Sequence, residues 1–215
     1  MNFFIFCLCG LVIFFSLLLG GKKYRSTALY ALAIGGVVNA NFFHAGSYPI
    51  NCFGLPFGID SIIYTLFVFC VIVMFIQETK SSAYLLGVSS IIAIVFSALM
   101  QLISDILSKG SSAIVWNSFL SFMISAFASV IAIIIMLEIL NKIKNKVNNY
   151  FLIIIGIIIT TVINSFIYYP LSILLSGVPE NIWILLLTSF LGKFIAMLFS
   201  LVTYFLITRI DKNKK

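Results

Sequence analysis

Long apolar runs separated by short polar breaks dominate the chain. Seven runs can be delimited, at residues 3–19, 28–46, 61–76, 83–106, 113–140, 150–169 and 182–207. Most are close to the ~20 residues that a helix needs to cross a bilayer. Strands would leave backbone groups unpaired in hydrocarbon, and no alternating barrel pattern is present. The pattern predicts an all-α fold, a polytopic membrane helix bundle of six to seven transmembrane helices, forming one domain over residues 1–215.

The flanks of the first run decide how this run is interpreted. A secretory signal peptide carries its positive charges before its apolar stretch. Here the basic residues Lys22, Lys23 and Arg25 follow the run instead. This order favours a retained helix with its N-terminus outside, and it leaves open whether the segment 3–19 crosses the whole bilayer.

Composition and charge agree with a lipid environment. The chain is 62% hydrophobic and 9% charged, too apolar for the polar shell of a soluble protein. If all seven runs span, eleven lysines and arginines fall on one side and only Lys109 on the other. Short cytoplasmic loops collect such residues, so we expect a multi-pass protein of the cytoplasmic (plasma) membrane with its C-terminus inside. This topology accounts for the net charge of +7, and no nucleic-acid partner is indicated.

Lys193 is the most informative polar residue because it is the twelfth residue of the last run. A lysine near the bilayer centre costs about 2.5–3.5 kcal/mol on insertion scales. On a helix, Ser189, Ala196 and Ser200 share its face, and this small polar stripe would point into the bundle. We favour a substrate or counter-ion contact; a structural salt bridge or a side chain reaching the interface is the alternative.

Carboxamides form the second group of candidate binding residues. Gln101, Asn117 and Asn164 lie in helical stripes of small polar residues, and Asn39 and Asn41 stand near the outer end of the second run. An amide offers a donor and an acceptor together, which suits the edge of a neutral heterocycle. With Trp116 and Tyr168 nearby, these residues predict a cavity for a flat polar solute. Trp183 is interpreted first as an interfacial anchor.

The segment 44–60 interrupts the apolar pattern with two prolines and three glycines. It predicts an ordered re-entrant or capping loop that is not helical, lining a cavity, or else an ordinary connection at the headgroup level. Asp60 begins the next helix, where it can cap that helix or contact the solute.

Five short pieces carry a resemblance to a known family: Val38-Asn39-Ala40-Asn41-Phe42-Phe43, Phe57-Gly58-Ile59-Asp60, Phe127-Ala128-Ser129, Ile163-Asn164-Ser165-Phe166 and Gly192-Lys193. In this order they resemble the vitamin uptake transporter (VUT) family, better known as queuosine precursor transporters, over most of the chain from the second run onward. The resemblance implies a compact helix bundle that carries 7-cyano-7-deazaguanine or a related deazapurine. It also implies that Asn39, Asp60 and Lys193 stand at the family's asparagine, aspartate and lysine.

The chain departs from this family at two acidic positions. Tyr64 stands where the family usually has a glutamate, and Asn164 stands where it has an aspartate. These two differences leave the exact substrate and any proton coupling open. The main alternative is the substrate-binding membrane subunit of an energy-coupling-factor vitamin transporter, which would dock on an ATPase module through small residues such as Ala31 and Gly35.

An enzyme is the hypothesis from another class, and the sequence does not favour it. The only histidine, His44, lies in the outer segment, and neither a nucleophile elbow nor a metalloprotease motif is present. We predict no catalytic residues, no metal ligands and no cofactor. Glu138, near the end of the fifth run, is expected to pair with Lys142 one helical turn later.

Overall fold

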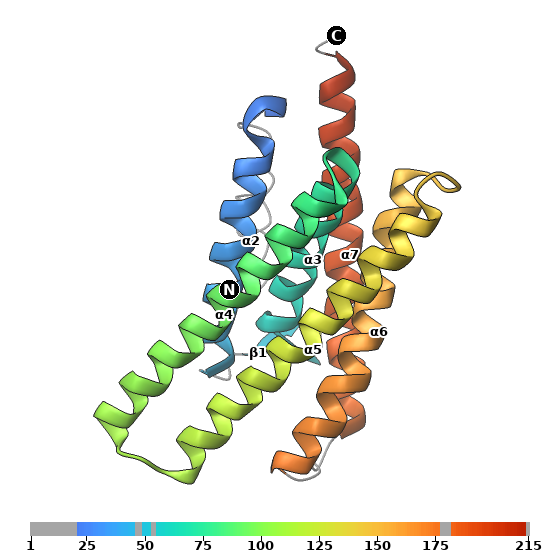
Figure 1. The fold of residues 1–215 in the computed structure, drawn as a ribbon. Helices are drawn as coiled ribbons and strands as arrows, with labels where there is room; N and C mark the ends of the chain where they lie inside the picture. Colours follow the sequence, from blue (N-terminus) through green and yellow to red (C-terminus); the bar gives the residue numbers. More distant parts are fainter. Residues whose placement is uncertain (1–20, 46–48, 53–54, 177–181, 214–215) are drawn as a thin grey trace.

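The computed structural model describes residues 21–45, 49–52, 55–176 and 182–213 (Figure 1). The predicted first helix, 3–19, lies outside the described residues. The described chain forms a bundle of helices with one small hairpin. Its helices are α2 (Gly21–Ala45), α3 (Ile59–Gln77), α4 (Lys80–Lys109), α5 (Ala113–Ile143), α6 (Asn149–Ser176) and α7 (Ile182–Asn213).

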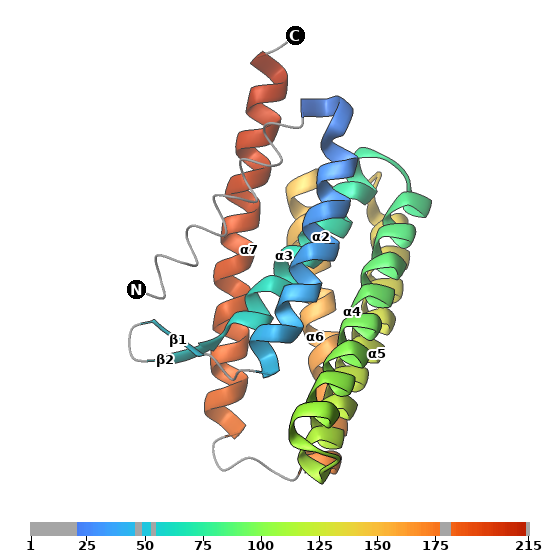
Figure 2. The ribbon, with the colours of Figure 1, turned by 90° about the vertical axis from the view of Figure 1, so that its left-hand side faces the viewer.

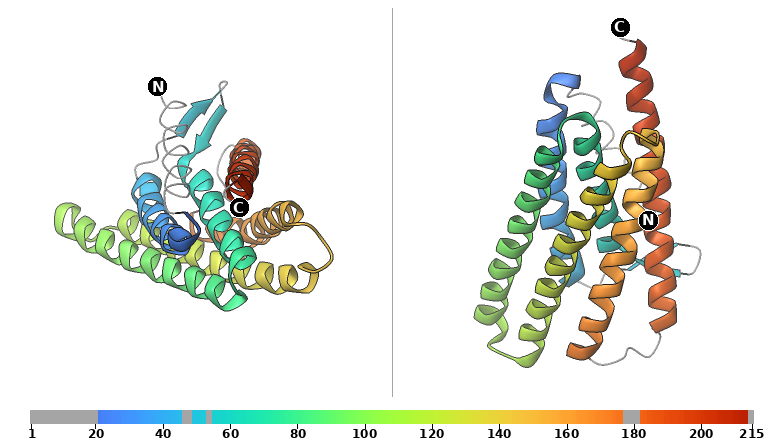
Figure 3. Two further views of the ribbon diagram at one scale, coloured as in Figure 1. Left: turned by 90° about the horizontal axis from the view of Figure 1, so that it is seen from above. Right: turned by 45° about the vertical axis from the view of Figure 1, so that its right-hand side comes forward.

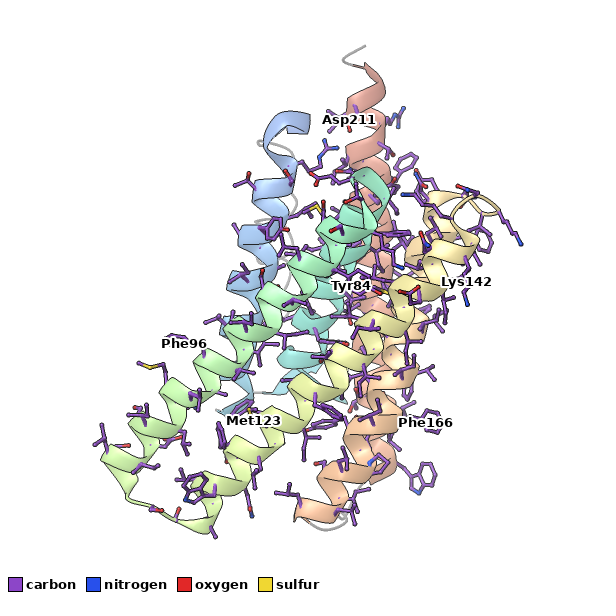
Figure 4. The ribbon with its side chains drawn as sticks, viewed as in Figure 1. Tyr84, Phe96, Met123, Lys142, Phe166 and Asp211 are labelled. Atoms are coloured by element: carbon purple, nitrogen blue, oxygen red, sulfur yellow. The ribbon has the colours of Figure 1, made fainter. Side chains whose placement is uncertain are left out.

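Each apolar run from the second to the seventh corresponds to one of these helices. Four of the helices are long and apolar enough to cross a membrane, over Lys80–Ser108, Ala113–Ile143, Asn149–Leu175 and Leu186–Asp211, and Ile62–Gln77 is a shorter apolar stretch. Large apolar side chains such as Phe96 and Phe166 project outward from the bundle (Figure 4), with 65% and 77% of their surface exposed. The structure is that of a membrane-embedded helical protein, since lipid is the medium that can cover such a surface.

The segment between α2 and α3 is a β-hairpin. Strands β1 (Pro49–Cys52) and β2 (Leu55–Gly58) pair antiparallel, with Pro49 opposite Gly58. The predicted break in the helices is confirmed for residues 49–52 and 55–58, which form strands, whereas residues 44–45 and 59–60 are helical and residues 46–48 and 53–54 lie outside the described residues. Strand β2 packs on α7, and Figure 2 shows the hairpin beside the half of α7 that lies near the start of α3.

Helix α3 occupies the centre of the bundle. It packs on α2, α4, α6 and α7, and Figure 3 shows it enclosed by them when the molecule is viewed from above. Every residue from Thr65 to Phe75 is buried. A helix that is apolar on all sides suits a position enclosed by other helices or by lipid, and the composition of α3 agrees with its central position.

Side chains that accept hydrogen bonds from free backbone amides cap the starts of α4 and α5. Thr79 caps α4 by accepting a hydrogen bond from the amide of Ser82, and Ser112 caps α5 by accepting one from the amide of Val115. Gly110, with φ of 75°, ends α4 in a backbone conformation that favours glycine. These caps extend the helices beyond the apolar runs, so the helices are longer than predicted.

Helix α6 does not end before Pro170, as the run 150–169 predicted. It continues through Pro170 to Ser176. A proline removes one hydrogen bond of the helix, but the apolar residues after it still favour a helix in contact with lipid. The helix is therefore longer than the apolar run 150–169, since transmembrane helices tolerate a proline.

The basic residues gather at one end of the bundle. Helix α2 begins there, α7 ends there, and the turns before α4 and before α6 lie there as well (Figure 1). Lys80 on α4 pairs with Glu138 on α5 at 2.7 Å, and the hydroxyl of Tyr84 donates to the same carboxylate at 2.8 Å. The predicted pairing of Glu138 with Lys142 is therefore corrected, because a partner on the adjacent helix lies closer than the one on the same helix.

Candidate functional site

Lys193 is buried inside the bundle, at the level where α6 and α7 pack. Only 7% of its surface is exposed, and its Nζ donates a hydrogen bond to Ser165 Oγ on α6 at 3.5 Å. On the same face of α7, Ala196 and Ser200 are completely buried. The prediction that this stripe points inward is confirmed. A lysine held away from both water and lipid needs polar neighbours to offset its desolvation.

Several polar side-chain atoms are buried without any hydrogen-bond partner in the described part of the chain. They are Tyr64 Oη, Ser90 Oγ, Ser97 Oγ, Gln101 Oε1, Asn164 Oδ1 and Arg25 Nε. The Tyr64 hydroxyl lies close to Ser129 on α5, but outside hydrogen-bonding geometry. Buried polar groups are normally paired, so such a collection indicates sites where water or a ligand completes the hydrogen bonding.

Cross-helix contacts show that two of these atoms lie at the same depth. Helices α3 and α6 are in close contact at Ile72 and Gly156, where a Cβ on residue 156 would lie 2.6 Å from Ile72 Cδ1. The two helices run in opposite directions. Tyr64 and Asn164 are each eight residues from this contact, toward the same end, which corresponds to about 12 Å along both helices. They therefore share one level of the bundle.

The neighbouring helices bring further polar residues to that level. Ser121 Oγ on α5 and Tyr168 Oη on α6 are 3.3 Å apart, which sets the relative height of these antiparallel helices. Gly87 on α4 similarly packs on Ile133 on α5. Ser97 lies ten residues further along α4 than Gly87, toward the same end of the bundle as Asn164. Measured against α5, which packs on both α4 and α6, Ser97 and Asn164 lie at about the same height.

We call the set Tyr64, Ser97, Asn164, Ser165 and Lys193 the polar layer. Its members come from α3, α4, α6 and α7 and lie at about one depth, and Lys193 and Ser165 are hydrogen-bonded to each other. It combines a cation with hydroxyl and amide groups, three of which have no partner. Its chemistry is that of a site that donates and accepts hydrogen bonds around one positive charge.

The structure separates the other predicted site residues. Gln101 lies one turn beyond Ser97 on the same face of α4, with its Oε1 buried and unpartnered. Asn117 is exposed near the start of α5. Asn39 and Asn41 belong to the last turns of α2 and Asp60 to the first turn of α3, but their side chains lie outside the described residues.

The predicted aromatic lining of the site divides in the same way. Trp183 is 80% exposed, in keeping with an interfacial anchor, and Trp116 is 43% exposed and donates from Nε1 to Ser111 Oγ at 3.0 Å. Of these three aromatic residues, only Tyr168 is hydrogen-bonded to a neighbouring helix, through its hydroxyl and Ser121 on α5. Sequence reasoning treated Tyr64 only as the loss of an acid; its position in a helix that is apolar on all sides was the signal that its hydroxyl would be buried.

The described residues contain no group of three or more histidine, cysteine or acidic side chains that could hold a metal ion. Comparisons with known proteins add no family assignment: no family model, curated protein or solved structure matches the chain. The polar layer therefore has to be interpreted from its own geometry.

Proposed function

We propose that this chain is a membrane transporter that imports a small, planar, polar solute. The observation that carries the proposal is the burial of Lys193 at the same depth as the unpartnered polar atoms of Tyr64, Ser97 and Asn164. A protein that served only as a membrane scaffold would gain stability by replacing such groups with apolar ones. An unsatisfied buried group costs about 1–3 kcal/mol, so a bound solute is the natural partner for the layer.

In this proposal Lys193 bears the charge of the site, and Ser165 holds its ammonium in place. Asn164 and Gln101 offer carboxamides to the polar edge of the solute, and Tyr64 adds a hydroxyl. We also assign Asn39, Asn41 and Asp60 to the proposed site. They lie at the ends of α2 and α3 that adjoin the hairpin, the side from which the solute is proposed to enter.

The cargo is proposed by resemblance to the queuosine precursor transporters, as a deazapurine or a vitamin-like molecule. Its fused ring would present donors and acceptors in one plane, which suits amide side chains. Tyr64 and Asn164 replace two acids of that family, so the layer carries less negative charge than the family pattern implies.

The proposed mechanism is alternating access in the cytoplasmic membrane. The basic end of the bundle faces the cytoplasm by the positive-inside rule, which places the C-terminus inside and the N-terminus outside. The solute would enter from the side of the β1–β2 hairpin, reach the polar layer, and leave at the basic end. Transport of this kind requires two conformations, each open on one side.

Uptake of labelled solutes tests the proposal. Cells that lack their own routes are supplied with a labelled deazapurine or with water-soluble vitamins, with and without the chain. Accumulation of one of these solutes is expected, and Lys193→Ala should abolish it while the protein still inserts. Lys146→Ala, which removes an exposed lysine from the basic end, is the matched control and should leave uptake unchanged. No accumulation of any of these solutes, or full uptake by Lys193→Ala, would overturn the proposal.

One observation favours the second candidate, a substrate-binding subunit of an energy-coupling-factor transporter. Ala31 is exposed on α2, and a Cβ added at Gly35, one turn later, would meet no heavy atom within 4 Å. Such a face allows the close approach of a partner helix. Co-purification with an ATPase module, and uptake that depends on that module, would support this candidate over a solitary transporter.

A further inference from the structure

An ion pair between Arg25 and Asp211 joins helices α2 and α7 at the basic end of the bundle. Arg25 Nη1 donates to Asp211 Oδ2 at 2.7 Å, and Arg25 Nη2 donates to Asp211 Oδ1 at 2.9 Å. The two side chains are only 6% and 20% exposed. Paired contacts of this kind are the strongest that an arginine makes with a carboxylate. The pair is therefore the main polar link between the first and last helices of the described bundle.

The ion pair joins two helices that share α3 as a neighbour but otherwise pack on different helices. Helix α2 packs on α3 and α4, whereas α7 packs on α3 and α6. Helix α3 lies between them, so the pair closes over it at the basic end. Figure 4 shows Asp211 on the last turns of α7, on the side of the chain that faces α2. Separating the two charges would let α2 and α7 move apart without disrupting another extensive interface between them.

One face of α7 connects this ion pair with the polar layer. Residues at spacings of three and four fall on the same side of a helix, and each intervening residue of this face is buried: Met197, Ser200, Tyr204 and Ile207. From Lys193 to Asp211 the face is about 27 Å long. The pair thus stands at one end of a continuous buried face whose other end carries the buried lysine.

The pair is also energetically suited to open. Among the described residues Arg25 Nε is buried without a hydrogen-bond partner, so these residues leave one guanidinium donor unsatisfied in the closed arrangement. The attraction within a buried ion pair offsets the free-energy cost of desolvating its charges only when the remaining donors are also hydrogen-bonded. Opening would expose Nε and both charges to water, which offsets the loss of the two hydrogen bonds. The Lys80–Glu138 pair is more exposed and links two helices that already pack along their length, so it lacks these properties.

We propose that the Arg25–Asp211 pair is a latch that closes the basic end of the bundle over the polar layer. The inference rests on the proposed transport function, because it assigns the described structure to the conformation closed at that end. The latch holds α2 to α7, and its release opens a path along the face of α7 toward Lys193. Tyr204 lies on this face and accepts a hydrogen bond of 3.0 Å from Asn149 Nδ2 on α6, so this contact is released when the path opens.

Thiol labelling tests the latch without any assay of transport. Ser200 is completely buried midway along the face, so Ser200→Cys, in a chain whose four native cysteines are replaced by alanine, reports access to it. The protein is reconstituted in nanodiscs and treated with a water-soluble maleimide. Asn145→Cys, in the exposed turn before α6, shows that the reagent is active. Labelling at position 200 should be slow while the latch is intact.

Arg25→Ala and Asp211→Asn should each raise the labelling rate at position 200 by about tenfold or more, since breaking a buried ion pair costs several kcal/mol. Arg25→Asp combined with Asp211→Arg should restore protection, which also shows that the single variants are folded. Glu138→Gln, the matched change in the exposed pair, should leave labelling unchanged. Unchanged labelling in both single variants, or no protection in the exchanged pair, would overturn the latch. Because the assay uses no solute, its failure is separate from a failure of uptake.

Discussion

Gly156 and Ile72 meet where α6 passes α3, so closely that a Cβ on residue 156 would lie 2.6 Å from Ile72 Cδ1. This contact sets the relative height of the two helices and thereby brings Tyr64 and Asn164 to one level. A glycine at this position serves packing, and a side chain there would force the helices to shift or the isoleucine to move.

The first prediction concerns this contact. Gly156→Ala should lower the melting temperature in detergent, because overpacking costs about 1–3 kcal/mol and outweighs the ~1 kcal/mol that alanine gains in a helix. Ile72→Val removes Cδ1, so the double variant should recover part of the loss. Gly35→Ala, where the space is open, should be neutral or stabilising. Strictly additive effects of the two changes would show that the close contact does not exist.

The second prediction uses two tyrosines whose hydroxyl groups have opposite surroundings. Tyr64→Phe should raise the melting temperature of the solute-free protein, because it removes a hydroxyl that has no hydrogen bond. Tyr204→Phe should lower it by the equivalent of about 1 kcal/mol or more, because Asn149 Nδ2 loses its acceptor. Thermal unfolding of both variants measures the difference. A destabilised Tyr64→Phe variant would mean that the hydroxyl is paired within the protein.

The third prediction compares two asparagines that sequence reasoning treated alike. Asn164→Leu should raise the KM for uptake by about tenfold or more, since it removes a hydrogen-bonding group worth ~1–3 kcal/mol from the polar layer. Asn117→Leu should change the KM less than about threefold, because this side chain is exposed on α5, where a change is worth about 0.5 kcal/mol or less. Equal effects of the two substitutions in a kinetic uptake assay would remove Asn164 from the site.

The fourth prediction concerns Pro170, which lies inside α6 on its exposed side. Pro170→Ala restores a backbone donor to the helix and should stabilise the protein, since an interior proline costs about 3 kcal/mol. If α6 bends here during transport, uptake should become slower although the protein melts at a higher temperature. Leu174→Ala, one turn later and 82% exposed, is the control and should affect neither quantity strongly. A faster or unchanged uptake rate would show that the bend is not used.

The helices could be predicted from the sequence because lipid imposes a simple rule on apolar runs. Runs of the right length became α2 to α7, and the glycines and prolines between residues 44 and 60 correctly indicated a break. The inward orientation of Lys193 also followed from local information, since its helical face consists of small residues. These features depend on neighbours within a few turns of the same helix.

The composition of the polar layer could not be predicted in the same way. Tyr64 and Asn164 are a hundred residues apart in the chain, and they share a level because Gly156 lets α6 approach α3. Glu138 illustrates the same limit: Lys142 is its neighbour in sequence, but Lys80 on another helix is its partner. Heights of helices relative to each other are set by packing, and no periodicity within one helix encodes them.

The unequal lengths of the helices have a consequence for the host membrane. The apolar spans of α4 and α5 contain 29 and 31 residues, about 45 Å each, against 26 residues on α7, whereas the hydrocarbon layer measures about 30 Å. Figure 1 shows both running obliquely to α7. An oblique course is how a long apolar helix fits a thin bilayer, and a thicker bilayer would draw it upright. Bilayer thickness therefore acts as a mechanical variable on this fold, and vesicles made from lipids of different chain length should alter the angle between α4–α5 and the rest of the bundle.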